Sequence, residues 1–75
     1  MMNKWISVKD RLPETWDNVL CWYEYIEYDD YEEIYHTYGI GFYAKGRWRG
    51  EITNKLGCRV IAWMPLPEPP IVKEN

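Results

Sequence analysis

The sequence contains no apolar run of about 18 residues, the minimum length of a membrane-spanning helix. Its first residues, MMNKWISVKD, include no apolar stretch of the kind that secretory signal peptides carry. Both absences predict a cytosolic protein that makes no membrane contact. In the cytosol its two cysteines, Cys21 and Cys58, are expected to stay reduced and to pack as small apolar residues. A disulfide between them would need their strands to be neighbours.

Side chains that support catalysis or metal binding are scarce. The chain has one histidine, His36, and one serine, Ser7, and nothing around Ser7 resembles a nucleophile elbow. The acidic segment lacks the alternating aspartates and central glycine of a calcium loop. The glycines of GIG (39–41) lie inside a predicted strand, which is the wrong context for a phosphate-binding loop. We therefore predict a protein that is not an enzyme and that uses neither a metal nor a cofactor.

Basic residues are absent between Leu12 and Ala44, a stretch that holds eight carboxylates. The local charge becomes positive from Lys45 to Arg59, where five basic residues accompany Glu51 as the single acid. With a net charge of −3, the chain does not offer the basic footprint of a nucleic-acid-binding protein. No direct contact with nucleic acid is expected.

Aromatic side chains are abundant, with five tryptophans, seven tyrosines and one phenylalanine in 75 residues. A chain this short buries a modest share of its surface, so it needs a dense core. Each buried aromatic ring removes a large area from water and can hold a small sheet together. We predict a single domain over residues 1–75, with an ordered core at about 4–70 and a tail at 71–75.

Alternating and β-branched patterns predict a β fold, since no segment carries a clear helical stripe. The fold class is all-β or mostly β, with a small α+β arrangement left open. Four to five short antiparallel strands would curl into a half-barrel or small sandwich. One short helical turn is allowed near Glu14 or Lys55. The predicted strands are KWISV (4–8), VLCWYEYIEY (19–28), IYHTYGIGFYA (34–44), a short strand around Trp48, and CRVIAWM (58–64); TWDN (15–18), DDYEE (29–33) and EITNKLG (51–57) are predicted as turns or loops.

Glycines mark two special points of this β pattern. Gly39 and Gly41 leave one face of their strand without side chains, which allows a bend, a bulge or the close approach of another group. The dipeptide Lys45-Gly46 lies between two β-like runs, where glycine supplies the positive φ of a hairpin turn.

The segment YEYIEYDDYEEIY (23–35) combines carboxylates with tyrosines. Carboxylates along a hairpin can imitate nucleic-acid phosphates and steer a basic partner, while tyrosines supply rigid contact area. The alternative is a solvated hairpin whose charges protect an edge strand from aggregation; an exposed strand edge could also support a homodimer. The predicted partner-binding residues are Glu24, Tyr25, Tyr28, Asp29, Asp30, Tyr31, Glu32, Glu33 and Tyr35.

A second hypothesis is a small-ligand site. Arginines hold phosphates through paired donors, and a tryptophan can stack on a base. The predicted ligand-binding residues, for a nucleotide that is bound or sequestered, are Arg47, Trp48, Arg49 and Arg59.

The tail AWMPLPEPP (62–70) has four prolines among the six residues that follow Met64. Such a segment favours polyproline II and could dock into a partner's aromatic groove. The alternative is that it leaves the last strand and packs on the protein's own aromatic side chains. Proline cannot donate to a sheet, so the strand is expected to stop at Met64.

Four segments resemble the pattern of the DUF551 family of small proteins found in tailed phages and prophages. They are WISVKDRLPE (5–14), VLCWY (19–23), GRW (46–48) and AWMPLPEPP (62–70). The end motifs W-I-x-V-x-x-R-L-P and W-M-P-L-P-x-P-P are specific in combination. Ala62 stands where family members commonly have a histidine, so any role of that histidine is lost here.

The resemblance implies an origin rather than an activity, because the family has no established activity to carry over. It implies a phage or prophage accessory protein that acts in the bacterial host cytoplasm. From the acidic-aromatic segment at residues 23–35, we predict that such a protein binds a host or phage protein. One such partner would be a host nucleic-acid-binding or defence factor that the protein inhibits.

Because the two end motifs occur together, we expect them to touch. The tail would then cross the first strand, with Trp5 and Trp63 on either side of Leu12, Pro13 and the tail prolines.

Overall fold

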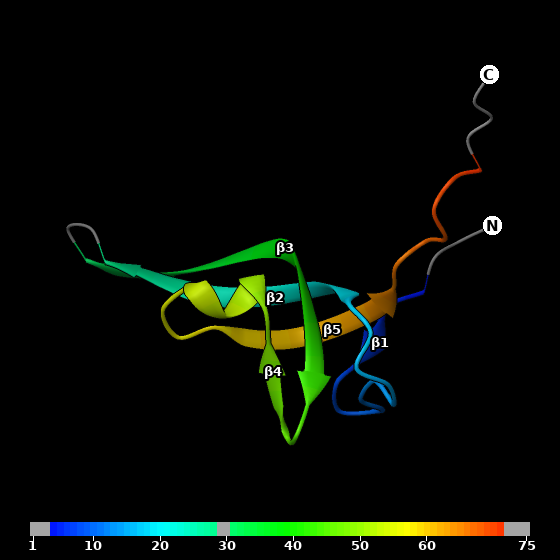
Figure 1. Cartoon of the computed structure of the whole chain (residues 1–75). Helices are drawn as coiled ribbons and strands as arrows, with labels where there is room; N and C mark the ends of the chain where they lie inside the picture. Colours follow the sequence, from blue (N-terminus) through cyan, green and yellow to red (C-terminus); the bar gives the residue numbers. More distant parts are fainter. Residues whose placement is uncertain (1–3, 29–30, 72–75) are drawn as a thin grey trace.

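The computed structural model describes residues 4–28 and 31–71 and contains one five-stranded antiparallel sheet. The strands lie in the order β1-β5-β2-β3-β4, and the sheet curls into a half-barrel (Figure 1). One short 3₁₀ helix, η1, precedes the last strand. The bounds are β1 Ile6–Ser7, β2 Val19–Tyr28, β3 Glu32–Ala44, β4 Arg47–Arg49, η1 Glu51–Asn54 and β5 Arg59–Pro65. The predicted mostly β fold with antiparallel strands is confirmed.

The strand limits follow the sequence pattern closely, with three differences. β2 has the predicted bounds, but β3 begins at Glu32 rather than residue 34, because Glu32 pairs with Tyr28 and extends the hairpin. β5 is shifted by one residue and includes Pro65. β1 is shorter than predicted, since the amides of Asp10 and Arg11 turn back to the carbonyl of Ser7. The Lys45-Gly46 turn is confirmed, with φ of 54° and 81° at the two residues.

The core lies on the concave face of the curled sheet. Side chains of a strand alternate between faces, so Val19, Cys21 and Tyr23 of β2 point inward together. A bulge at Ile61 breaks the pairing of β5 with β2 between Trp22 and Tyr23. The extra residue explains why Val60 and Trp63, three positions apart, both reach the core. The buried core cluster consists of Val19, Cys21, Tyr23, Ile52, Val60 and Trp63.

Ile52, from η1, fills the concave side of β3 and is 1% exposed. A β-carbon built on Gly39 would lie 2.7 Å from Ile52 Cγ2, and one on Gly41 would lie 2.7 Å from Ile52 Cδ1. Either distance is shorter than atoms tolerate, so the two glycines make room for this side chain. β3 also bends there (Figure 1), and after Gly41 it pairs with β4 instead of β2. The expected close approach of another group is confirmed.

The two end motifs touch, as predicted. Ile6 pairs with Trp63, and the indole Nε1 of Trp63 donates a hydrogen bond to the carbonyl oxygen of Arg11 at 2.9 Å. The proposed sandwich of Trp5 and Trp63 is wrong, because consecutive residues of a strand face opposite sides. Ile6 shares the concave face with Trp63, whereas Trp5 stacks on Tyr38 on the convex face, with ring centroids 6.1 Å apart.

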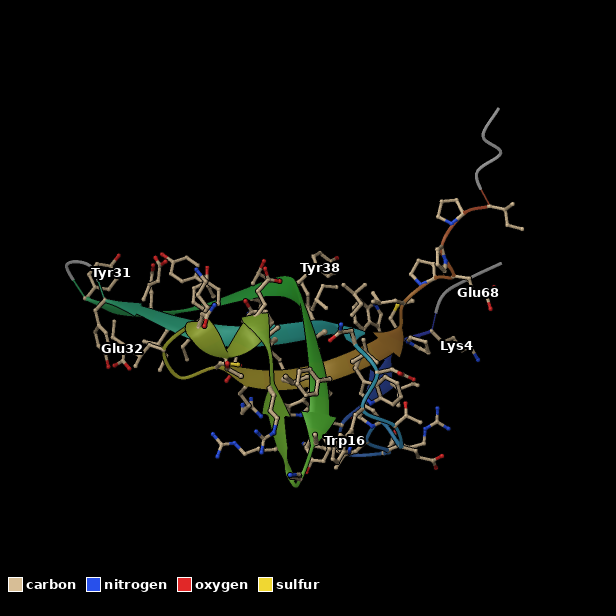
Figure 2. The ribbon with its side chains drawn as sticks, in the orientation of Figure 1. Lys4, Trp16, Tyr31, Glu32, Tyr38 and Glu68 are labelled. Atoms are coloured by element: carbon tan, nitrogen blue, oxygen red, sulfur yellow. The ribbon has the colours of Figure 1, made fainter. Side chains whose placement is uncertain are left out.

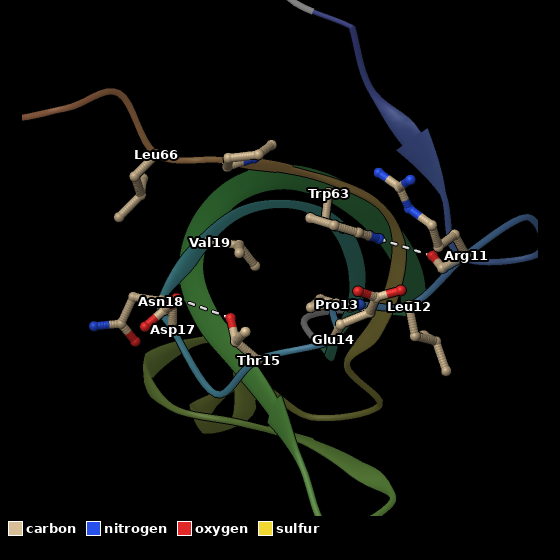
Figure 3. Close-up of a pocket in the computed structure, with 11 residues that line it drawn as sticks. Arg11, Leu12, Pro13, Glu14, Thr15, Asp17, Asn18, Val19, Trp63 and Leu66 are labelled. Carbon is tan, nitrogen blue, oxygen red and sulfur yellow. Dashed lines mark hydrogen bonds between the residues drawn. The ribbon is translucent and has the colours of Figure 1, made fainter.

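The Pro-rich tail packs on the N-terminal segment through its first residues. Pro65 and Leu66 line a cavity of about 380 Å³ at the end of the half-barrel, together with Leu12 and Pro13 (Figure 3). Residues 67–71 are exposed and lead away from the sheet (Figure 1). The expected packing does not extend to them because β1 begins at Ile6, opposite Trp63, which leaves no strand for the later prolines to cross.

The packing of Ile52 on Gly39 yields a test by double-mutant cycle. Gly39→Ala is expected to destabilise the fold by about 1–3 kcal/mol through overpacking, and Ile52→Ala by about 2–5 kcal/mol through a cavity. The cost of Gly39→Ala should fall in part in the Ile52→Ala background, since Cγ2 is gone while Tyr23 Cε1, 2.8 Å from the added carbon, remains. It should persist in the Ile52→Val background, which keeps Cγ2. Urea unfolding measures all variants, and equal costs in every background would contradict the contact.

Candidate functional site

The β2–β3 hairpin extends past the rest of the sheet. β5 accompanies β2 as far as Glu24, and β4 pairs with β3 from Phe42 onward. Residues 25–28 and 32–35 therefore form a two-stranded ribbon at one end of a molecule 53 Å long (Figure 1); these residues and Tyr31, which directly precedes Glu32, are called here the ribbon. Figure 2 shows Tyr31 and Glu32 at the end of this hairpin, opposite Lys4 and Glu68.

Large side chains of the ribbon are exposed. The exposed fraction is 65% for Tyr28, 69% for Tyr31 and 58% for Ile34. Tyr25 and Tyr35 stack across the two strands with ring centroids 5.8 Å apart, which stiffens the ribbon. The Tyr35 hydroxyl donates a hydrogen bond to Glu33 at 2.5 Å, and this bond raises the pKa of Tyr35.

The register divides the predicted partner-binding residues between two faces. Tyr25 pairs with Tyr35, and Glu27 pairs with Glu33, so these four side chains share one face. Tyr28 pairs with Glu32 on the other face. Asp29 and Asp30 lie outside the described residues. The structure thus places the described members of the set on one ribbon but on both of its sides.

Two glutamates stand directly opposite each other in the ribbon. Glu27 and Glu33 are cross-strand partners, and both are exposed. Like charges in directly opposed positions destabilise a hairpin. Among residues 4–28 and 31–71, both ion pairs involve Glu24, so neither of these two carboxylates is matched by a described base. Among the described residues, this like-charge pair is therefore met by the hydrogen bond from Tyr35 to Glu33 but by no ion pair.

Glu24, at the base of the ribbon, is held by the fold. Its Oε2 accepts a hydrogen bond from Arg59 Nε at 2.9 Å, and its Oε1 lies 3.5 Å from His36 Nε2. The hydrogen bond from Arg59 lowers the pKa of the Glu24 carboxyl. Glu24 was predicted to bind a partner and Arg59 to bind a ligand. Their ion pair gives both residues a structural role.

The predicted ligand-binding residues come together in part. Arg47, Trp48 and Arg59 line a cleft of about 710 Å³ between the β3–β4 turn and the start of β5. Trp48 meets Tyr43 edge to face, with ring centroids 5.3 Å apart. Arg49 does not line the cleft, and its Nε donates to the carbonyl oxygen of Ala44 at 3.0 Å.

An aromatic cluster on the convex face was not predicted. Trp22 lies 4.9 Å from Tyr38 and 5.8 Å from His36 between ring centroids, and Trp5 stacks on Tyr38 as well. The alternation of β2 placed Trp22 away from Tyr23, but the partners of Trp22 depend on the register with β3. His36 is thus part of a stacked cluster.

In the part of the chain that the structure describes, no helix has the length and apolar character to cross a membrane. No three His, Cys, Asp or Glu side chains among these residues converge as a metal site. Cys21 and Cys58 are both free thiols: Cys21, in β2, lies opposite Trp63, and Cys58 precedes β5.

Comparison with known proteins identifies the family of the chain. The model of a family described as "Protein of unknown function (DUF551)" matches residues 4–71. The chain belongs to the DUF551 family. The match takes in the ribbon, the cleft and both end motifs of this DUF551 protein. No curated protein and no solved structure matches the chain.

The lowered pKa of Glu24 gives a pH-dependent prediction. The carboxyl has a lower pKa folded than unfolded, so its contribution to stability is present above the ordinary value of 4.5 and is lost as the pH falls through the folded pKa. Glu24→Gln should therefore lower the melting temperature at neutral pH, and the gap to the parent should close below pH 4.5. Glu14→Gln, an exposed control, should show no such gap. A gap for Glu24→Gln that stays constant with pH would contradict the ion pair.

Proposed function

We propose that this DUF551 protein is a non-enzymatic interaction module whose ribbon binds the basic surface of a partner protein. The observation that carries the proposal is the opposed pair of Glu27 and Glu33 on a projecting hairpin, which forms no ion pair with the described residues. Real proteins accept such local conflicts at functional sites. A partner's lysines or arginines would neutralise both carboxylates. The two glutamates repel each other in the free protein, and in the complex both would attract the basic partner.

The tyrosines of the ribbon are the expected anchors of this interface. Tyr28 and Tyr31 expose most of their surface, and aromatic rings supply contact area at low cost in conformational entropy. Stacking of Tyr25 on Tyr35 holds one face of the ribbon in shape before binding. The carboxylates would steer the encounter and the tyrosines would set the residence time.

A nucleic-acid-binding protein of a bacterial host is the partner class that this chemistry fits. Such proteins carry basic surfaces shaped for phosphates, and carboxylates along the ribbon occupy the position of phosphates in that interaction. We propose that a phage or prophage protein of this kind acts in the host cytoplasm and inhibits its partner by covering the nucleic-acid site.

The first test is affinity capture from a bacterial lysate with tagged protein. We expect a basic host protein to be retained at about 0.1 M salt and released at about 0.5 M, because exposed charges are screened. Double-stranded DNA should compete for it, and Glu32→Lys combined with Glu33→Lys should abolish retention. A matched control, Glu14→Lys combined with Asp17→Lys, changes charge equally away from the ribbon and should retain the partner. Retention that survives the ribbon reversal would overturn the proposal.

A second test separates function from fold. Glu27→Thr removes the like-charge pair and adds a β-branched residue, so it should stabilise the protein by about 0.2–1 kcal/mol. The same change should weaken partner binding, measured by titration against the captured protein. If the hairpin is only solvated and binds no partner, Glu27→Thr should raise stability and change nothing else. If binding is unchanged while stability rises, the glutamate pair has no part in the interface.

A further inference from the structure

We propose that the cleft between the β3–β4 turn and β5 binds a nucleotide, a ligand with a phosphate group and a planar aromatic ring. The cleft lies apart from the ribbon's exposed end and does not depend on the proposed protein partner. Its walls come from the end of β3, from β4, from the segment after η1 and from the start of β5. The residues that carry the argument are Tyr43, Arg47, Trp48, Lys55, Cys58 and Arg59.

Three cations line the cleft without any carboxylate. They are Arg47, Lys55 and Arg59. Arg47 is exposed, and its guanidinium makes no hydrogen bond or ion pair with the described residues. Arg59 uses its Nε for Glu24, which leaves its other guanidinium donors for a ligand. Arg59 is paired with Glu24, and Lys55 Nζ lies 5.0 Å from the centroid of the Tyr25 ring, so the charge without such a partner among the described residues is that of Arg47, which a phosphate would neutralise.

The aromatic wall gives the cleft a second kind of contact. Trp48 is half-buried and fixed against Tyr43 with an interplanar angle of 71°, so its position does not depend on a ligand. A nucleobase can stack on an indole whatever its hydrogen-bonding edge. The cleft volume of about 710 Å³ falls within the range of small-molecule sites. Charge and ring together therefore favour a nucleotide over a simple anion.

Cys58 provides a built-in reporter of occupancy. Its thiol is half-buried in the cleft lining, whereas Cys21 is fully buried in the core. Burial raises the pKa of both thiols, that of Cys21 to about 12, so in the folded protein Cys58 should be the one that reacts with an alkylating reagent. A ligand that fills the cleft should slow this reaction.

The experiment is calorimetric titration of the full chain with ATP, AMP, adenosine and inorganic phosphate, followed by alkylation of Cys58 with each probe present. We expect a nucleotide to bind and to protect Cys58, with phosphate and adenosine at least about tenfold weaker because each supplies half of the contacts. Arg47→Ala should weaken nucleotide binding by at least about tenfold. Lys45→Asn, which removes a charge from the same turn outside the cleft and keeps a residue that tolerates positive φ, should leave binding unchanged.

The outcomes separate this proposal from the one for the ribbon. Binding of nucleotide to the Glu32→Lys, Glu33→Lys variant with unchanged affinity would support an independent site. Binding of inorganic phosphate as tightly as nucleotide would overturn the role of Trp48. Absence of heat and of Cys58 protection with every probe, or equal affinity in Arg47→Ala, would overturn the site. Loss of the protein partner in ribbon variants has no bearing on either result.

Discussion

Ile52 fills the concave side of the sheet because two glycines of β3 present no side chain there. Few of the residues that the structure describes are fully buried, so one side chain supplied by a 3₁₀ turn closes much of the core. The same contact fixes where η1 sits and, through η1, where the chain enters β5. The bend of β3 at these glycines carries β4 away from β2 and opens the cleft beside Trp48. The cleft and the core thus depend on one packing contact.

The ion pair of Glu24 and Arg59 lies where the body of the sheet ends and the ribbon begins. Arg59 opens β5 and faces Glu24, which is the last residue of β2 that β5 accompanies. Beyond this point no other strand pairs with the hairpin, which is supported by a hydrogen bond from the Ile26 amide to the carbonyl of Leu56, by Lys55 over the Tyr25 ring and by the packing of Tyr25 against the core. A ribbon with so little support stays folded through cross-strand pairs, and the stacked tyrosines offset the opposed glutamates.

Particular residues show how far the sequence could predict the fold and the candidate sites. The alternation of Val19, Cys21 and Tyr23 was enough to assign their shared face, and Lys45-Gly46 was enough to place a turn. Register was not predictable, because the pairing of β2 with β3 depends on the exact length of the loop between them. The opposed glutamates and the stacking of Trp22 on Tyr38 are consequences of register. The bulge at Ile61 likewise follows from packing, as no local signal marks it.

The sequence by itself determined the positions of the strands to within two residues, the Lys45-Gly46 turn, the separation of acidic and basic segments and the membership of the DUF551 family. Each of those properties depends on residues that are neighbours in the sequence or on the composition of a segment. The tertiary structure decided which distant residues meet: Ile52 with two glycines, Trp63 with the Arg11 carbonyl, and Arg47 with Arg59 in one cleft. It also decided that the later tail prolines leave the sheet. These outcomes depend on how the sheet curls and pairs, which is a property of the whole chain packing at once.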